Sequence, residues 1–209
     1  GQEPTSRAVC EYAASPRRDA YWAVDPHGRY LDPAHRVTDW WSTSIVSAAH
    51  ALIGGALETA VDGWLDAWRR AQDRVRASLS DGPIPEELAV ARAVARAASD
   101  DDLLVAASSM PVRDLELGLE APGRRAVASR GSNGIDGTLS TAAGAGWALG
   151  SAERRVWVTL GDLAALHDVG GLLAWSEVST SVTVVVVNND GGGIFGRLLV
   201  STFGRVSER

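Results

Sequence analysis

The sequence contains no lysine, and its absence excludes two kinds of chemistry from these residues. All 20 of the positions occupied by lysine or arginine are arginine, so neither a Schiff-base lysine nor the lysine of a P-loop is present. A single cysteine, Cys10, excludes a framework of internal disulfides. Cys10 lies in no nucleophile motif, and an incidental thiol is the simpler interpretation.

Long apolar runs and positive charge are also lacking. No segment approaches the roughly 20 apolar residues that span a bilayer, and the first residues, GQEPTSRAVC, lack the pattern of a secretory signal. We therefore expect a cytoplasmic protein. The net charge of −6 argues against a general nucleic-acid binder. The eight tryptophans follow no repeat, and we interpret them as packing residues, not as a platform for stacking bases.

A domain boundary is predicted at SDGPIP, residues 80–85, because glycine and two prolines interrupt both helices and strands. Before this segment, residues 20–25 have the pattern of a short strand and PHGRYLDP contains turn residues. Residues 61–79 carry apolar side chains at mostly helical spacing. We expect one domain over residues 1–80 and a second over residues 81–209.

Helices and strands alternate after the boundary. Helices are predicted at 85–98, 137–150 and 163–175, and strands at 102–108, 124–129, 156–160 and 182–187. The last strand, VTVVVV, is apolar at five of its six positions, which is typical of a strand covered on both faces. The alternation predicts an α/β fold, a doubly wound parallel sheet with helices on both faces.

Polar residues directly follow two of the predicted strands. Gly161 and Asp162 end the strand at 156–160, while Asn188, Asn189 and a glycine triplet end the strand at 182–187. A right-handed crossover places the ends of two such strands at one edge of the sheet, where ligands bind. We therefore expect Asp162 and Asn189 to lie close together.

The residue types at this edge suit a hard divalent cation. One carboxylate, one amide oxygen and carbonyls of a glycine-rich turn form an all-oxygen set of the kind that binds Mg²⁺ or Ca²⁺. Because only one group is charged, the ion keeps a positive charge and open positions that phosphate oxygens can fill. Separately, Gly-Asp can be a helix cap and Asn-Asn a turn. Their joint spacing favours a site that binds a cation and, through it, a diphosphate.

At these residues the chain resembles the thiamine diphosphate enzymes, whose metal motif is Gly-Asp followed one βαβ unit later by Asn-Asn. GDL at 161–163 and NN at 188–189 fit, although many members have glycine in place of Leu163. SRGSNGIDGTLSTAAGAG at 129–146, NNDGGGIF and GRYLDP resemble the branch of the family that acts in menaquinone biosynthesis. The resemblance covers most of the chain and is weakest in residues 1–80.

The resemblance implies a fold, a cofactor and a reaction. Residues 81–209 would be a diphosphate-binding domain of the thiamine diphosphate-binding fold, truncated at its C-terminus. Residues 1–80 would be the C-terminal part of a middle α/β domain. Complete members use thiamine diphosphate with Mg²⁺ or Mn²⁺ to decarboxylate 2-oxoglutarate and add the succinyl carbanion equivalent to isochorismate. They work as homodimers or tetramers.

The resemblance also implies roles for individual residues. The metal ligands would be Asp162, Asn189 and the carbonyl of Gly191. Further contacts with the cofactor would come from Leu163, Gly192, Ile135 and Ile194. Arginine binds carboxylates in bidentate fashion, and the residues that bind substrate or act on it would be Arg113, Arg130, Ser109, Phe195, Leu198 and Arg7. Each has a plainer alternative, an exposed or salt-bridged arginine or an apolar core residue.

Two parts of such an enzyme are not recognised in this sequence. In the family, a separate domain of the partner subunit supplies the glutamate that activates the aminopyrimidine of the cofactor, and more chain follows the metal loop. We therefore expect a piece of a larger enzyme that is inactive alone. Another thiamine diphosphate carboligase or decarboxylase and a non-catalytic diphosphate-binding module remain alternatives. A Rossmann dehydrogenase is disfavoured, because no G-x-G-x-x-G follows an early strand.

Overall fold

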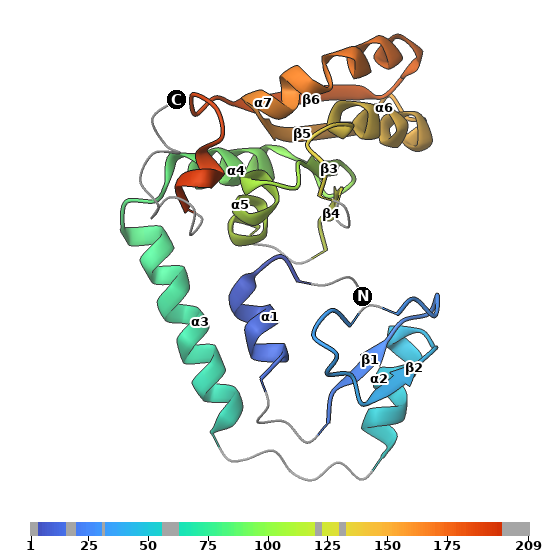
Figure 1. Cartoon of the computed structure of the whole chain (residues 1–209), viewed down its shortest axis with the longest axis vertical. Helices are drawn as coiled ribbons and strands as arrows, with labels where there is room; N and C mark the ends of the chain where they lie inside the picture. Colours follow the sequence, from blue (N-terminus) through green and yellow to red (C-terminus); the bar gives the residue numbers. More distant parts are fainter. Residues whose placement is uncertain are drawn as a thin grey trace. The chain divides into compact units, whose positions relative to one another are not determined.

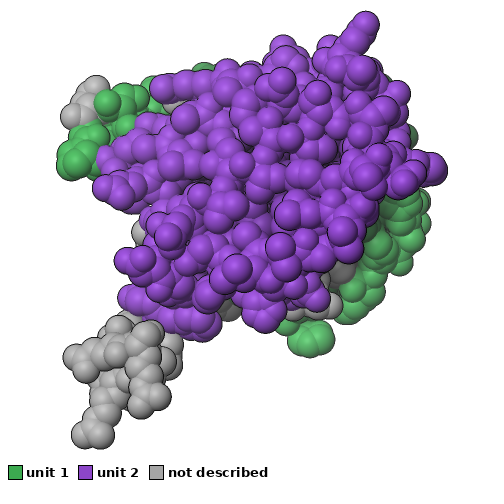
Figure 2. All heavy atoms as spheres, turned by 90° about the horizontal axis from the view of Figure 1, so that it is seen from above, with its two compact units in different colours: residues 1–83 green, residues 84–209 purple. Residues whose placement is uncertain are grey.

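The computed structural model describes residues 4–15, 20–30, 32–55, 63–119, 123–129 and 133–197. The chain divides into two compact units, residues 1–83 and residues 84–209 (Figure 2). The division falls inside the SDGPIP segment. Over the described ranges, no helix has both the length and the apolar character that crossing a membrane requires.

Unit 1, residues 1–83, consists of short elements and one long helix (Figure 1). In chain order they are α1 (Arg7–Ala13), β1 (Trp22–Val24), β2 (Asp39–Trp41), α2 (Ile45–Gly54) and α3 (Trp64–Asp81). β1 and β2 pair in parallel, with Trp22 opposite Asp39. The sequence predicts β1 and α3, but it gives no signal for β2, because three residues are too few to show a period.

Two buried aspartates hold the turn segment that follows β1. The side chain of Arg29 donates to Asp25 at 2.9 Å, and this bond is the main reason why the pKa of Asp25 falls to about 2. Asp32 accepts hydrogen bonds from the amides of Arg36 and Val37, at 3.0 and 2.8 Å. Buried carboxylates require such partners, so these two residues stabilise the turn that PHGRYLDP predicts.

The tryptophans are more exposed than the packing interpretation predicts. Several pack against another ring, as Trp22 does on Trp41 with ring centroids 5.2 Å apart. Nevertheless, five of the eight are more than a third exposed: Trp22, Trp40, Trp64, Trp68 and Trp147. Four of these five pack against an aromatic ring, as the interpretation requires. The interpretation does not fit Trp147 of α6, which is 71% exposed.

Unit 2, residues 84–209, contains a parallel sheet with helices on both faces (Figure 1). Its elements are α4 (Glu86–Ala97), β3 (Leu103–Ala106), α5 (Met110–Gly118), β4 (Arg125–Ala128), α6 (Thr138–Leu149), β5 (Arg155–Gly161), α7 (Asp162–His167), η1 (Val169–Glu177), β6 (Ser181–Val187) and η2 (Gly193–Arg197). The strand order is β4-β3-β5-β6, and every pair is parallel. The predicted α/β class is confirmed.

The sheet separates two apolar cores. On one face, Val156, Val158 and Leu160 of β5 pack with residues of α6 and α7, and all three are completely buried. On the other face, Leu104 and Ala106 of β3 pack with residues of α4 and α5. Alternate residues of a strand point to opposite faces, so the apolar runs of β3 and β5 supply both cores at once.

The helix predicted at 163–175 is wrong in its second half. The α-helix α7 ends at His167, and residues 169–177 form the 3₁₀ segment η1. Asp168 lies between them and is buried. Its carboxylate accepts from the amide and the hydroxyl of Ser140, at 2.8 Å each, and so ties this corner to the first turn of α6. Gly170 and Gly171 follow shortly after, and glycine is a poor helix former.

The prediction that β6 is covered on both faces is met only in part over the described residues. Val182 and Val184 contact one core and Val185 the other. However, no residue of β6 is fully buried, and Val186 is 48% exposed. Only β5 pairs with β6 among the residues described. The apolar pattern of a strand indicates that it favours burial. It does not show which other strands and helices lie beside it.

Two glycines of α6 provide a matched test of this packing. A Cβ at Gly146 would lie 2.8 Å from Cγ1 of Val178, whereas a Cβ at Gly144 would meet no atom within 4 Å. We expect Gly146→Ala to lower the free energy of unfolding by about 1–3 kcal/mol through overpacking. Gly144→Ala should raise it by about 0.5–1 kcal/mol, because alanine is the better helix former. Urea unfolding followed by circular dichroism measures both, and equal effects at the two positions would contradict the described packing of α6.

Candidate functional site

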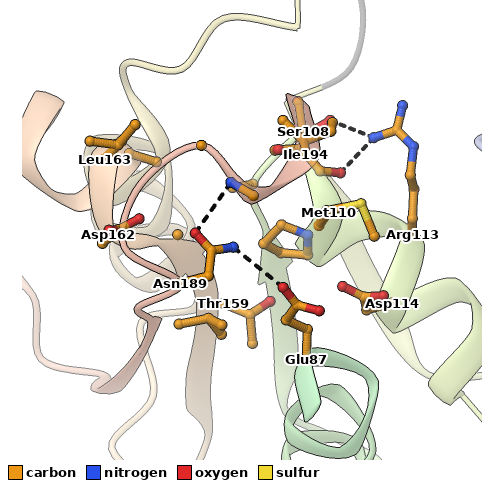
Figure 3. Close-up of a pocket in the computed structure, with 18 of the residues that line it drawn as sticks. Glu87, Ser108, Met110, Arg113, Asp114, Thr159, Asp162, Leu163, Asn189 and Ile194 are labelled. Carbon is orange, nitrogen blue, oxygen red and sulfur yellow. Dashed lines mark hydrogen bonds between the residues drawn. The ribbon is translucent and has the colours of Figure 1, made fainter. Parts of the chain in front are cut away.

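The sheet reverses its winding between β3 and β5. From β3 the chain adds β4 on one side, and from β5 it adds β6 on the other, as the order β4-β3-β5-β6 shows. In open parallel sheets, such a reversal leaves a crevice beyond the carboxyl ends of the strands, where ligands bind. A cavity of about 450 Å³ lies at this place (Figure 3). Its size is that of a small-molecule site.

The cavity collects residues that are far apart in the sequence. The segments after β3, β5 and β6, the first turns of α4 and α5, and residues 133–135 all line it. Of the site residues that the sequence predicts, those that line the cavity are Ser109, Arg113, Ile135, Asp162, Leu163, Asn189, Gly192, Ile194 and Phe195.

The pairing of β5 with β6 brings the two polar strand ends together. Gly161 lies opposite Val187 in the parallel register. Asp162 follows the first strand and Asn189 the second, and both line the cavity (Figure 3). The expectation that these two residues lie at one edge of the sheet is therefore confirmed.

The glycine-rich loop after β6 follows a path that few other residues could take. Asp190, Gly191 and Gly192 have consecutive positive φ angles of 59°, 87° and 67°, a conformation that costs glycine little. Gly191 is not among the cavity residues, but a Cβ there would lie 3.7 Å from both δ carbons of Leu163. The loop therefore folds back over the start of α7.

The side-chain amide of Asn189 is held at both of its ends. Its nitrogen donates to Oε1 of Glu87 at 3.3 Å, and its oxygen accepts from the amide of Gly193, also at 3.3 Å (Figure 3). A Cβ at Gly193 would lie only 2.4 Å from the Asn189 nitrogen. Glycine is thus required at position 193 for Asn189 to keep this place.

The groups around Asp162 and Asn189 differ from a carboxylate-rich metal cage. Over the described part of the chain, no three histidine, cysteine, aspartate or glutamate side chains are grouped as a metal site. The available groups are one half-buried aspartate, the Asn189 amide and loop carbonyls. Hard oxygen donors with one or two carboxylates suit a divalent ion that shares its coordination with phosphate.

Arg113 lies at the rim of the cavity on α5 (Figure 3). Its Nη1 donates to the carbonyl oxygens of Ser108 and Ser109, in the turn that leads from β3 into α5. The hydroxyl of Ser108 in turn donates to the carbonyl of Ser129, which follows β4. One nitrogen of the guanidinium is therefore fixed by the turn, while its planar fork leaves further donors that can bind an anion.

Three further predicted site residues are Arg7, Arg130 and Leu198. Arg7 is on α1 of unit 1, where its side chain is 83% exposed and pairs with Glu11 at 2.7 Å. This is the plainer alternative that the sequence leaves open for Arg7. Arg130 and Leu198 lie outside the described residues.

Several polar residues of the cavity are not singled out by the sequence, Glu87 and Thr159 among them. In the sequence, Glu87 is recognisable only as an acidic residue in the first turn of a helix. Thr159, on β5, is 5% exposed, and its hydroxyl has no hydrogen-bond partner within the described ranges. One signal for Thr159 exists, since it is the only polar residue in the run VWVTL.

Comparison with known proteins gives a consistent result. No protein-family model matches the chain. The chain is 40% identical over 214 residues to the 2-succinyl-5-enolpyruvyl-6-hydroxy-3-cyclohexene-1-carboxylate synthase of Rubrobacter xylanophilus, a match that covers 100% of the chain and 36% of that protein. It is 36% identical to the synthase of that name from Halorubrum lacusprofundi, covering 97% of the chain and 34% of the relative. It is 41% identical to that of Salinibacter ruber, covering 83% and 30%.

The chain belongs to this synthase family. The similarity to the first two relatives runs through both units, because the matches cover all or nearly all of the chain. The chain nevertheless spans only about a third of the length of these curated relatives. The branch of enzymes that the sequence motifs predict is therefore confirmed.

Thr159, which lines the cavity, and Thr180 are both buried and provide a matched test of hydrogen bonding in unit 2. The hydroxyl of Thr180 donates to the carbonyl of Gly146 at 2.8 Å and accepts from the amide of Ser151 at 3.2 Å, whereas that of Thr159 has no such partner among the described residues. We expect Thr180→Val to lower the free energy of unfolding by about 1–3 kcal/mol. Thr159→Val should leave it unchanged or raise it by up to about 1 kcal/mol, because no hydrogen bond is lost. Thermal and urea unfolding measure both variants, and a large loss at Thr159 would show that its hydroxyl is bonded.

Proposed function

We propose that this chain supplies the diphosphate-binding part of a synthase that uses thiamine diphosphate and Mg²⁺, or Mn²⁺. One observation carries the proposal. Asp162 of the Gly-Asp motif and Asn189 of the Asn-Asn motif line one cavity at the winding reversal of a parallel sheet. The similarity to three 2-succinyl-5-enolpyruvyl-6-hydroxy-3-cyclohexene-1-carboxylate synthases supports it.

In this proposal the metal ligands are Asp162, the side-chain oxygen of Asn189 and the carbonyl of Gly191. The oxygen chemistry of these groups fits a hard cation, and the tight glycine loop allows a diphosphate to approach the backbone. Leu163, Gly192, Ile135 and Ile194 are the residues proposed to contact the cofactor. When bound, thiamine diphosphate supplies the electron sink that decarboxylation of a 2-oxo acid requires.

The proposed substrates are 2-oxoglutarate and isochorismate, and both carry carboxylates. Arg113 is suited to bind one of them, because the turn after β3 holds its Nη1 and presents the rest of the guanidinium at the cavity. Ser109 lies beside it. Phe195, which is 55% exposed at the cavity, offers an apolar wall. Arg130, Leu198 and Arg7 are proposed as further substrate contacts.

The proposed reaction needs more than this chain. We infer that a pyrimidine-binding domain and a second subunit supply the group that activates the cofactor, in a cytoplasmic homodimer or homotetramer. The 209 residues alone are then expected to be inactive as a synthase. Residues of this chain would bind the metal, orient the diphosphate and hold the substrate carboxylates.

The cofactor site is tested by titrating thiamine diphosphate into the chain by calorimetry, with Mg²⁺ and again with EDTA. We expect binding heat that requires Mg²⁺ and an affinity at least about tenfold weaker in Asp162→Ala, which loses the charged ligand. Asp100→Ala is the matched control, because it removes one carboxylate whose side chain is 96% exposed and which lies outside the cavity. It should bind as the unchanged chain does.

Two results would contradict this assignment. Equal affinities in Asp162→Ala and Asp100→Ala would remove Asp162 from the metal site. Binding that is the same in Mg²⁺ and EDTA would show that no cation takes part.

A further inference from the structure

Two carboxylates of the cavity, those of Glu87 and Asp114, have no role in the proposed site. Glu87 lies in the first turn of α4 and is half-buried, and its Oε1 accepts a hydrogen bond from the side-chain nitrogen of Asn189 at 3.3 Å (Figure 3). The two residues are 102 positions apart in the sequence. A contact of this range, between a helix of one core and the loop after the last described strand, is specific to the folded unit.

The contact selects which end of the Asn189 amide faces which neighbour. An ionised carboxylate only accepts hydrogen bonds, so Glu87 pairs with the NH₂ end and not with the oxygen. The backbone amide of Gly193 only donates, so it pairs with the oxygen end. The two partners have opposite preferences and thus favour the same orientation. A reversed amide would place its oxygen against the carboxylate and its NH₂ against an N–H group.

The orientation decides whether Asn189 can serve a cation. Only the oxygen of a carboxamide coordinates a hard divalent ion. That oxygen carries two lone pairs, so it can keep the bond from the Gly193 amide and still bind an ion. Hydrogen-bond partners that orient a metal ligand typically change metal affinity by about 10- to 100-fold when they are removed.

Glu87 is well placed for this task because its helix is firmly held. Leu88 and Ala91, one and four residues further along α4, are 3% and 4% exposed. A carboxylate on a rigid element fixes its partner more closely than one on a loop would. Glu86, the preceding residue in the same turn, is exposed and does not line the cavity.

We propose that Glu87 is a positioning residue that holds the side-chain amide of Asn189 with its oxygen toward the glycine loop, so that the loop presents an oxygen to a divalent cation. Its link to a cation rests on the proposed function. The orientation of the amide is a property of the chain without ligand, and it can be measured separately.

Three variants separate this role from simpler effects. Glu87→Ala removes the acceptor and the charge, while Glu87→Gln keeps an acceptor oxygen of the same reach. Glu86→Ala is the matched control, because it removes one carboxylate from the same helical turn without touching Asn189. Any effect of charge near the start of α4 should appear in Glu86→Ala as well. Thermal unfolding of all three shows whether the fold is kept, and Glu87→Gln covers the case in which Glu87→Ala does not fold.

The first readout is the side-chain NH₂ signal of Asn189 in ¹⁵N–¹H spectra of the ligand-free chain, assigned through its loss in Asn189→Asp. We expect this signal to move in Glu87→Ala, to move less in Glu87→Gln, and to stay in place in Glu86→Ala. A merely structural glutamate would not produce this order. An unchanged signal in folded Glu87→Ala, or the same shift in Glu86→Ala, would overturn the proposal. If Glu87→Ala does not fold, an unchanged signal in Glu87→Gln would overturn it as well.

The second readout is Mg²⁺-dependent binding of thiamine diphosphate, measured by calorimetry. We expect the affinity to fall about tenfold in Glu87→Ala, to recover in part in Glu87→Gln, and to be unchanged in Glu86→Ala. Unchanged binding in Glu87→Ala, beside a clear loss in Asp162→Ala, would overturn the role of Glu87 while the proposed function stands. No Mg²⁺-dependent binding in the unchanged chain would overturn the proposed function and with it the link to a cation. The NH₂ signal then still decides whether Glu87 orients Asn189.

Discussion

The parallel pairing of β5 with β6 is the constraint on which the candidate site depends. Seven residue pairs, from Arg155 opposite Ser181 to Gly161 opposite Val187, set the register. A slip of one residue would exchange the two faces of β6 and move Asn189 along the edge. In this register the last residues of β5 and β6 lie opposite each other. The Gly-Asp and Asn-Asn motifs that follow the two strands therefore lie close enough to form one site. The buried valines and leucine of β5 hold that strand in place from one face.

The sequence predicts the features that follow from local pattern. Apolar runs mark β5 and β6, their alternation with helices indicates the parallel sheet, and the rule for strand ends places Asp162 near Asn189. What it misses depends on distant partners. Asp168 at the end of α7 bonds to Ser140, 28 positions away, and β6 is partly exposed because only β5 pairs with it in the described sheet. No local pattern contains this information.

In the candidate site, too, local sequence patterns predict some residues, and others are found only through the fold. Ligand types and spacing single out Asp162, Asn189 and the glycine loop, and residues of all three motifs meet around the cavity. The partners that hold these groups are not visible in the sequence. Glu87 approaches Asn189 from a helix 102 positions earlier, and the Ser108 and Ser109 carbonyls that fix Arg113 belong to its own turn but form no motif. Motifs thus identify groups that act on a ligand, while the fold identifies those that orient them.

We propose above all that Asp162 and Asn189 share one divalent cation with a diphosphate. Anomalous X-ray diffraction from crystals of the chain grown with Mn²⁺ and thiamine diphosphate tests it most directly, since Mn²⁺ scatters anomalously and the ligand oxygens would be seen beside it. We expect one strong peak within coordination distance of the Asp162 carboxylate and the Asn189 side-chain oxygen, with diphosphate density on its open side. A Mn²⁺ peak elsewhere, or diphosphate density away from these two residues, would contradict it.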